Sequence, residues 1–136
     1  MVDHLLHEFS AAPDFVPTRG ETTPLAQIHA MFLATHARFQ AKPELFIVLS
    51  ELVLRSLRDA TLRSALQQLD DEWHRYLHYL VSEGIRQGAF RADLDPGEMA
   101  TRLIILIKGF LFHQITSPDN IDFHQLDNDV ERLLLP

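Results

Sequence analysis

The chain has 136 residues and a formal net charge of −7, and it contains no cysteine. The length predicts one domain, and a composition of 46% hydrophobic and 23% charged residues is typical of a globular protein and excludes general disorder. Without cysteine the chain has no disulfide, no thiolate nucleophile and no thiolate metal site, which fits the reducing cytoplasm.

Basic side chains are scattered along the chain from Arg19 to Arg132, and no segment gathers them into a patch. Nucleic acid binding needs such a patch, so we expect no direct contact with DNA or RNA.

The segment Met1–Phe9 lacks the features of a secretory signal. The longest apolar run, Leu103–Ile107, is far shorter than the roughly 20 residues of a membrane span. These features predict a cytoplasmic protein.

Helix signals dominate the first half of the chain, and no stretch alternates as a strand would. The segment Val2–Ala12 reads as a short helix, and Pro13–Thr22 reads as a loop. Thr23 and Pro24 form a capping residue followed by proline at the first helical position, and the helix continues to about Gln40. Pro43 starts the next helix, which ends at about Leu57.

The second half contains three more helices. Asp59 can cap a long helix from Ala60 to about Gln87, and Gly88 ends it, because glycine adopts the left-handed stop at little cost. A complete start signal at Asp95 opens a helix to about Ile115, and a capping box precedes the last helix, Phe123–Leu135. The whole pattern predicts an all-α fold, a multi-helix bundle.

The helix that begins at Asp95 is apolar around nearly its whole circumference between Leu103 and Ile115. A helix on the surface of a monomer needs an apolar arc of little more than about 100°. We therefore expect a second copy of the chain to cover part of it, because homodimer interfaces resemble a protein core. The alternative is the central helix of a monomeric bundle. Gly109, inside this helix, favours close approach by another helix.

Several stretches resemble one protein family. They are Leu57–Arg63 (LRDATLR), Trp73, Gly84–Pro96 (GIRQGAFRADLDP) and Lys108–Phe110 (KGF). In this order they resemble the C-terminal regulatory domain of TetR/AcrR-family transcriptional regulators. The resemblance extends from about Pro24 to Leu135.

The resemblance implies a ligand-binding and dimerisation domain in which the last two helices pair with those of a second subunit in a four-helix bundle. It divides the single domain into a linking helix and loop (1–23), effector-pocket helices (24–94) and dimerisation helices (95–136). It also implies a small, largely apolar effector that alters the spacing of two DNA-reading heads. No segment here matches the helix-turn-helix head, so DNA binding is not carried over to any residue.

Two sets of candidate site residues follow. The effector set combines aromatic and soft side chains with a few polar groups, as small-molecule pockets do, although each aromatic could simply fill the core. Its members are Met31, Thr35, His36, Phe39, Trp73, Tyr76, Leu77, Phe110 and His113. The dimer-interface set consists of Leu103, Ile104, Ile107, Leu111, Ile115, Phe123, Leu126, Val130 and Leu133.

Other chemistry finds little support. His74 and His78 have a spacing compatible with metal binding, but no third ligand is placed near them, which favours an ordinary polar helix face. The run Asp70–Glu72 fans around its helix, so its carboxylates do not converge as catalytic pairs do. We expect no catalytic residue, metal or cofactor. The alternative function is a headless interaction module that forms homo- or heterodimers without a ligand.

Overall fold

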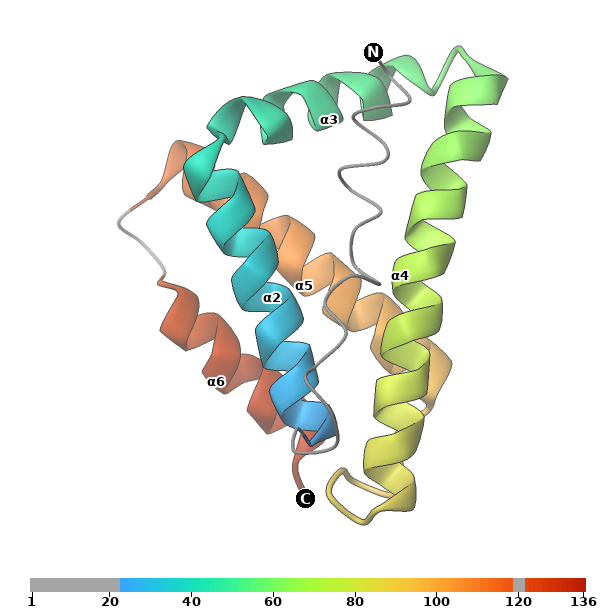
Figure 1. Ribbon diagram of the computed structural model, residues 1–136, viewed down its shortest axis with the longest axis vertical. Helices are drawn as coiled ribbons and strands as arrows, with labels where there is room; N and C mark the ends of the chain where they lie inside the picture. The colour runs from blue at the N-terminus through green and yellow to red at the C-terminus, as the bar shows by residue number, and fades with distance from the viewer. Residues whose placement is uncertain (1–22, 119–121) are drawn as a thin grey trace.

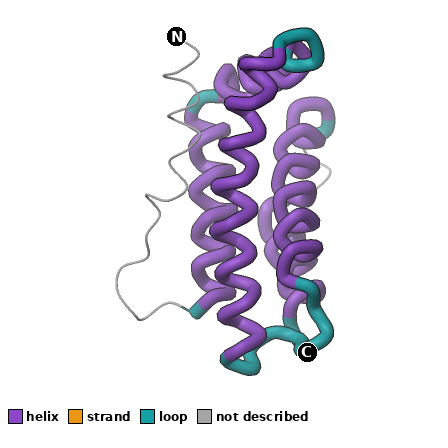
Figure 2. The backbone as a smooth tube through the Cα atoms, turned by 90° about the vertical axis from the view of Figure 1, so that its right-hand side faces the viewer, coloured by secondary structure: helices purple, strands orange, loops and turns teal. Residues whose placement is uncertain are grey.

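The computed structural model describes residues 23–118 and 122–136, which form five α-helices and contain no strand (Figure 2). The helices are α2 (Pro24–Ala41), α3 (Pro43–Arg55), α4 (Ala60–Arg86), α5 (Pro96–Thr116) and α6 (Phe123–Leu134). The predicted all-α fold is confirmed, and the predicted helix ends lie within about two residues of the observed ones. The helix expected at Val2–Ala12 and the loop after it lie outside the described residues.

Helix α2 is in contact with each of the other four described helices. It lies between α4 and α6, and α3 crosses one end of the molecule (Figure 1). The most extensive packing joins α4 to α5, which passes behind α2 in the same view. The central position of α2 means that a change at α2 can reach every other described helix.

Side-chain caps fix four of the helix starts. Thr23, Asp59, Asp95 and Asp122 each accept a hydrogen bond from a backbone amide in the first turn of the helix that follows. At α6 the side-chain oxygen of Gln125 also accepts a hydrogen bond from the backbone amide of Asp122, which completes the predicted capping box. The caps satisfy amide groups that a helix cannot satisfy by itself.

The hydrophobic core has α5 as its largest contributor. Its inward side consists of Met99, Ala100, Leu103, Ile104, Ile107, Phe110 and Leu111, all buried. In length and composition α5 is the one described helix apolar enough to cross a membrane, a test that the core helix of a soluble protein also passes. Burial of this side accounts for much of its apolar character.

A glycine-based turn joins α4 to α5. Gly88 has a φ of 77°, and the amides of Gly88 and Ala89 donate to the carbonyls of Ile85 and Gly84, which together form a Schellman motif. The ring of Phe90 then lies directly on Gly84, where a β-carbon would come within 2.1 Å of the ring. Only glycine at this position allows the chain to turn so closely against α4.

Replacing Gly84 with alanine is expected to lower the free energy of unfolding by about 1–3 kcal/mol, because the added methyl group overlaps the Phe90 ring. Alanine at an exposed helical position would raise stability instead, so the sign of the change identifies the contact. Urea denaturation measures it. In a Phe90→Ala background the same replacement should cost much less. Equal losses in both backgrounds would show that the ring is not the cause.

Candidate functional site

The candidate effector residues divide by depth in the structure. Met31, Thr35, His36, Leu77 and Phe110 are buried, Phe39, Trp73 and Tyr76 are half-buried, and His113 is exposed. Thr35 donates its hydroxyl to the carbonyl of Met31 within α2. The structure thus places part of this set in the packed interior and part of it at the edge of the core.

His36 forms the clearest polar point in this interior. Its ring stacks on Phe123 of α6 with centroids 4.9 Å apart and meets Phe110 of α5 edge-on at 5.3 Å. The side chain of Gln114 forms a hydrogen bond with the ring, but the buried Nε2 atom has no partner among the described residues. Burial lowers the pKa of His36 below its ordinary value, and the bond to Gln114 only partly offsets this.

Aromatic side chains continue from this point toward α3. Phe39 of α2 meets Phe46 of α3 at a centroid distance of 5.5 Å, and Phe46 lies 6.1 Å from Phe112 of α5. On α4, Trp73 and Tyr76 are half-buried against the core, and burial raises the pKa of the Tyr76 hydroxyl above its ordinary value. Apolar surface with a few polar atoms therefore borders α2, α3 and α4.

The dimer-interface set divides between the core and the surface of the single chain. Six of its members are buried by their own chain and offer little or no surface to a second copy: Leu103, Ile104, Ile107, Leu111, Leu126 and Val130. Phe123 and Leu133 are half-buried, and Ile115 is exposed. The inward side of α5 and α6 holds these six residues because it packs against the rest of the bundle.

The outward side of α5 carries apolar residues that were not in that set. Ile105 is 63% exposed and Phe112 is 61% exposed. They are seven positions apart, which places them on one side of the helix. Gly109 lies between them, and a β-carbon added there would meet nothing within 4 Å. The close helix approach expected at Gly109 is thus not made within the described part of the chain.

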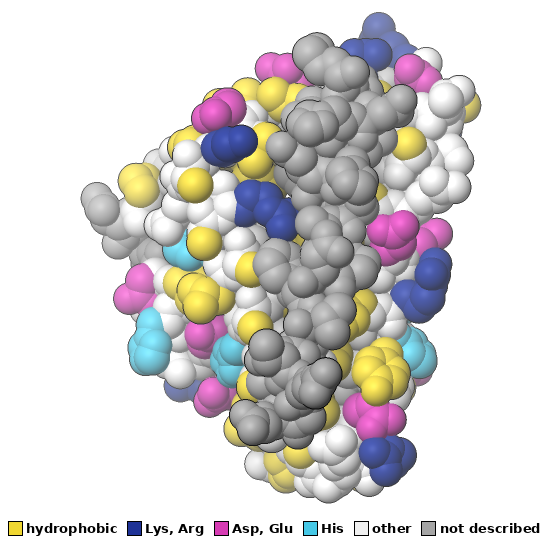
Figure 3. Space-filling view, in the orientation of Figure 1, with side chains coloured by type: hydrophobic (Ala, Val, Ile, Leu, Met, Phe, Trp, Pro, Cys, Tyr) yellow, Lys and Arg dark blue, Asp and Glu magenta, His cyan; other side chains and the backbone are white. Residues whose placement is uncertain are grey.

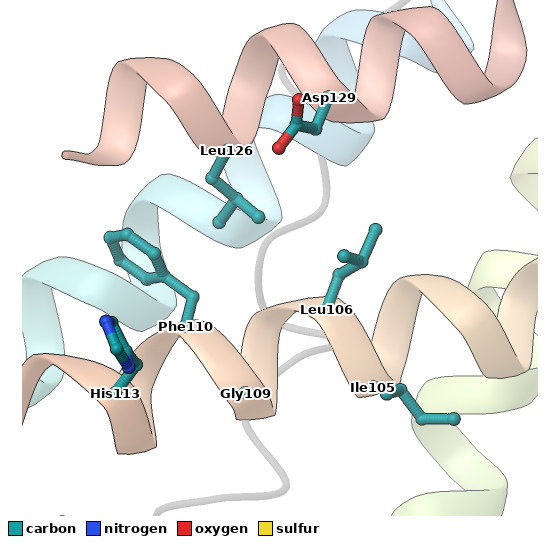
Figure 4. Close-up of a pocket in the computed structure, with 7 residues that line it drawn as sticks. All are labelled: Ile105, Leu106, Gly109, Phe110, His113, Leu126 and Asp129. Carbon is teal, nitrogen blue, oxygen red and sulfur yellow. The ribbon is translucent and has the colours of Figure 1, made fainter. Parts of the chain in front are cut away.

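A groove of about 420 Å³ runs between α5 and α6 beside this surface (Figure 4). It is lined by Ile105, Leu106, Gly109, Phe110, His113, Leu126 and Asp129. Leu106 and Phe110 point toward α6, whereas Ile105 points away from it. The groove is open and largely apolar, and only Phe110 and His113 of the effector set reach it.

The two histidines on α4 have structural contacts. Nε2 of His74 lies 3.0 Å from the carbonyl oxygen of Gly97, and this contact connects α4 to the start of α5. Nδ1 of His78 lies 3.5 Å from the hydroxyl of Ser82. Within residues 23–118 and 122–136, no group of three histidine or acidic side chains is arranged to hold a metal ion.

The lowered pKa of His36 predicts a pH dependence. In the folded chain the ring stays neutral at pH values where the unfolded chain already binds a proton, so stability falls as pH drops below about 6.5. His36→Phe keeps the ring contacts and removes this contribution. Urea unfolding between pH 5 and pH 8 should show a smaller acid-side loss for the variant. Parallel curves for the two proteins would rule out a buried neutral His36.

Comparisons with known proteins agree with this architecture. Residues 24–135 match the family described as BetI-type transcriptional repressor, C-terminal. A TetR transcription regulator from Haloarcula marismortui ATCC 43049 has a similar solved structure, with a TM-score of 0.78 and 20% identity over 98% of this chain and 71% of that chain. A search of the curated proteins finds no match. With the family match covering most of its length, the chain belongs to the TetR family of transcriptional regulators as a C-terminal domain of the BetI type.

Proposed function

We propose that this domain senses a small, largely apolar effector and forms a homodimer through α5 and α6, as a non-catalytic part of a cytoplasmic regulator. The effector contacts lie within residues 24–94 together with the facing side of α5. Residues 95–136 supply the dimer contacts. The chain itself makes no direct contact with nucleic acid or membrane in this proposal.

The dimer proposal rests on the apolar residues that the outer side of α5 exposes. Ile105 and Phe112 expose large apolar side chains, and the helix has an open position at Gly109 between them. Exposed apolar surface of this kind is typical of interaction sites. In a two-fold dimer this surface meets its own copy, and the bare backbone at Gly109 allows the two α5 helices to approach closely.

The second helix of the proposed interface has a different character. Helix α6 turns Leu126, Val130 and Leu134 into the core and exposes Asn128 and Asp129. Polar residues of this kind form the rim of an interface around an apolar centre. We therefore assign the centre of the dimer to α5 and its rim to α6.

Ile105→Glu tests the dimer. Symmetry would bury two added carboxylates per dimer, so we expect the dissociation constant to rise at least about a hundredfold. Sedimentation equilibrium at micromolar concentration should give a dimer for the wild type and a 15.6 kDa species for the variant. Leu54→Glu, on the outer side of α3 and similarly exposed at 67%, is the matched control and should stay dimeric. A monomeric wild type would refute the proposal.

The effector proposal depends on the interior around α2. Nε2 of His36 is a buried polar atom without a partner among the described residues, and such atoms are rare because each costs about 1–3 kcal/mol. A hydrogen-bonding group on a ligand would satisfy it. The half-buried aromatic side chains Phe39, Trp73 and Tyr76 supply surface for an apolar body.

Trp73 is the single tryptophan of the chain and reports on this region. A series of small aliphatic and aromatic alcohols and amines should include compounds that raise the melting temperature and change Trp73 emission, with about 2.7 kcal/mol of added stability at a hundredfold excess over Kd. The change should persist in the Ile105→Glu monomer. If the series alters neither melting nor emission, a ligand-free interaction module is the better description.

On the face of the molecule shown in Figure 3, Lys and Arg side chains lie in separate places among acidic ones. The visible part of this face therefore has no broad basic patch of the kind that binds phosphate backbones. This supports a role in which the domain regulates DNA binding without touching DNA.

A further inference from the structure

His29 of α2 contacts two carboxylates of α6. Its Nδ1 atom lies 2.7 Å from Oδ1 of Asp127, and its Nε2 atom lies 3.3 Å from Oε1 of Glu131. The side chains of His29 and Asp127 are about one-quarter exposed, and that of Glu131 is 44% exposed. One imidazole thus connects two successive turns of α6 to the central helix.

The protonation state of the ring decides how many of these contacts are attractive. A neutral imidazole has one N–H and one lone pair, so it donates to one carboxylate and turns a lone pair toward the other. The imidazolium ion has two N–H groups and can donate to both. Both contacts are therefore attractive only when His29 carries a proton.

We propose that His29 is a proton-dependent latch that holds α6 against α2. In the neutral form the shorter contact, from Nδ1 to Asp127, remains as a hydrogen bond. Protonation adds the bond from Nε2 to Glu131 and a favourable charge interaction with both carboxylates. The latch is tight when the ring carries a proton and loosens when the ring is neutral, and histidine is the side chain that ordinarily changes its charge between pH 5 and pH 8.

The other contacts of α6 do not respond to pH in the way that the His29 contacts do. Leu126, Val130 and Leu134 bury an apolar stripe that does not respond to pH. Phe123 stacks on His36, whose burial favours the neutral ring. Among the described residues, Asp127 and Glu131 are the charged groups that contact His29, and Gln114 is the polar group that forms a hydrogen bond with His36. Mild acid therefore strengthens one histidine contact and opposes the other.

The latch gives the domain a route of regulation, and this consequence depends on the proposed function. Helix α2 carries the candidate effector residues Met31, Thr35 and His36, and α6 forms the rim of the proposed dimer. A displacement of α2 by an effector would change the latch distances and with them the position of α6. The latch itself is a property of one chain and can be tested without an effector or a dimer.

Hydrogen exchange of backbone amides in the full 136-residue chain tests the latch. After correction for intrinsic exchange rates, α6 protection relative to α4 should be about twofold to fivefold higher at pH 6 than at pH 8, as expected for a partly exposed ion pair. His29→Gln, which cannot take up a proton, should remove this excess of α6 protection at pH 6. His78→Gln, at an exposed histidine that contacts no carboxylate among the described residues, is the matched control and should keep it.

A double-mutant cycle separates the two contacts. Coupling between His29→Gln and Glu131→Gln in α6 protection should appear at pH 6 and vanish at pH 8. Coupling between His29→Gln and Asp127→Asn should persist at both pH values, because the neutral ring still donates to Asp127. A Glu131 coupling that is independent of pH, or absent at both pH values, would overturn the proposal.

Nitrogen NMR of the wild-type ring provides a readout that needs no variant. We expect both ring nitrogens of His29 to carry a proton in the charged ring, and Nδ1 alone to keep its proton in the neutral ring that forms as pH rises. A neutral ring with its proton on Nε2 would also overturn the proposal. Sedimentation reports failure of the dimer separately, so the latch and the proposed function can fail independently.

Discussion

The contact between Gly84 and the ring of Phe90 is the constraint on which the direction of α5 depends. The ring fits against α4 only because Gly84 has no side chain, and this lets the chain reverse within a few residues after Gly88. The turn then brings Arg91 to the end of α6, where its backbone amide and its guanidinium donate to the carbonyls of Leu134 and Leu133. One close approach therefore orients α5 and also provides the site that receives the end of α6.

Helix α2 connects the candidate effector region to the proposed dimer interface. It touches all of the other described helices, and its two histidines both face α6, two turns apart. The helix that carries half of the candidate polar groups for an effector is thus also the helix that holds the rim of the proposed interface. Coupling between the two regions needs no long chain of contacts, because a single rigid helix borders both.

The sequence was sufficient to predict the helices but not which side of α5 faces the core. Helix starts such as Thr23, Asp59 and Asp95 depend on residues within one turn, and the stop at Gly88 depends on one residue's conformational freedom, so local patterns revealed them. The inward and outward sides of α5 could not be separated, because residues Leu103–Ile107 are apolar at every angle around the helix. Only the packed neighbours show that Leu103 faces inward and Ile105 outward.

The partners of His29 illustrate the same limit. Asp127 lies 98 positions away in the sequence, and nothing near either residue indicates that they meet. Nε2 of His36, which has no partner in the described part of the chain, could not be identified from the sequence either, since its burial arises from rings on α5 and α6. Contacts of this range depend on the assembled bundle, which the helical pattern alone does not specify.

The attachment of α6 by Arg91 has a consequence for how the protein is made. Helix α6 follows the other described helices in the chain, and each surface that receives it, on α2, on α5 and at the turn around Arg91, belongs to earlier parts of the chain. Its docking can therefore complete this bundle only after α6 itself has been synthesised and has left the ribosome. Nascent chains still under synthesis would expose the groove beside α5 without the helix that forms its second wall.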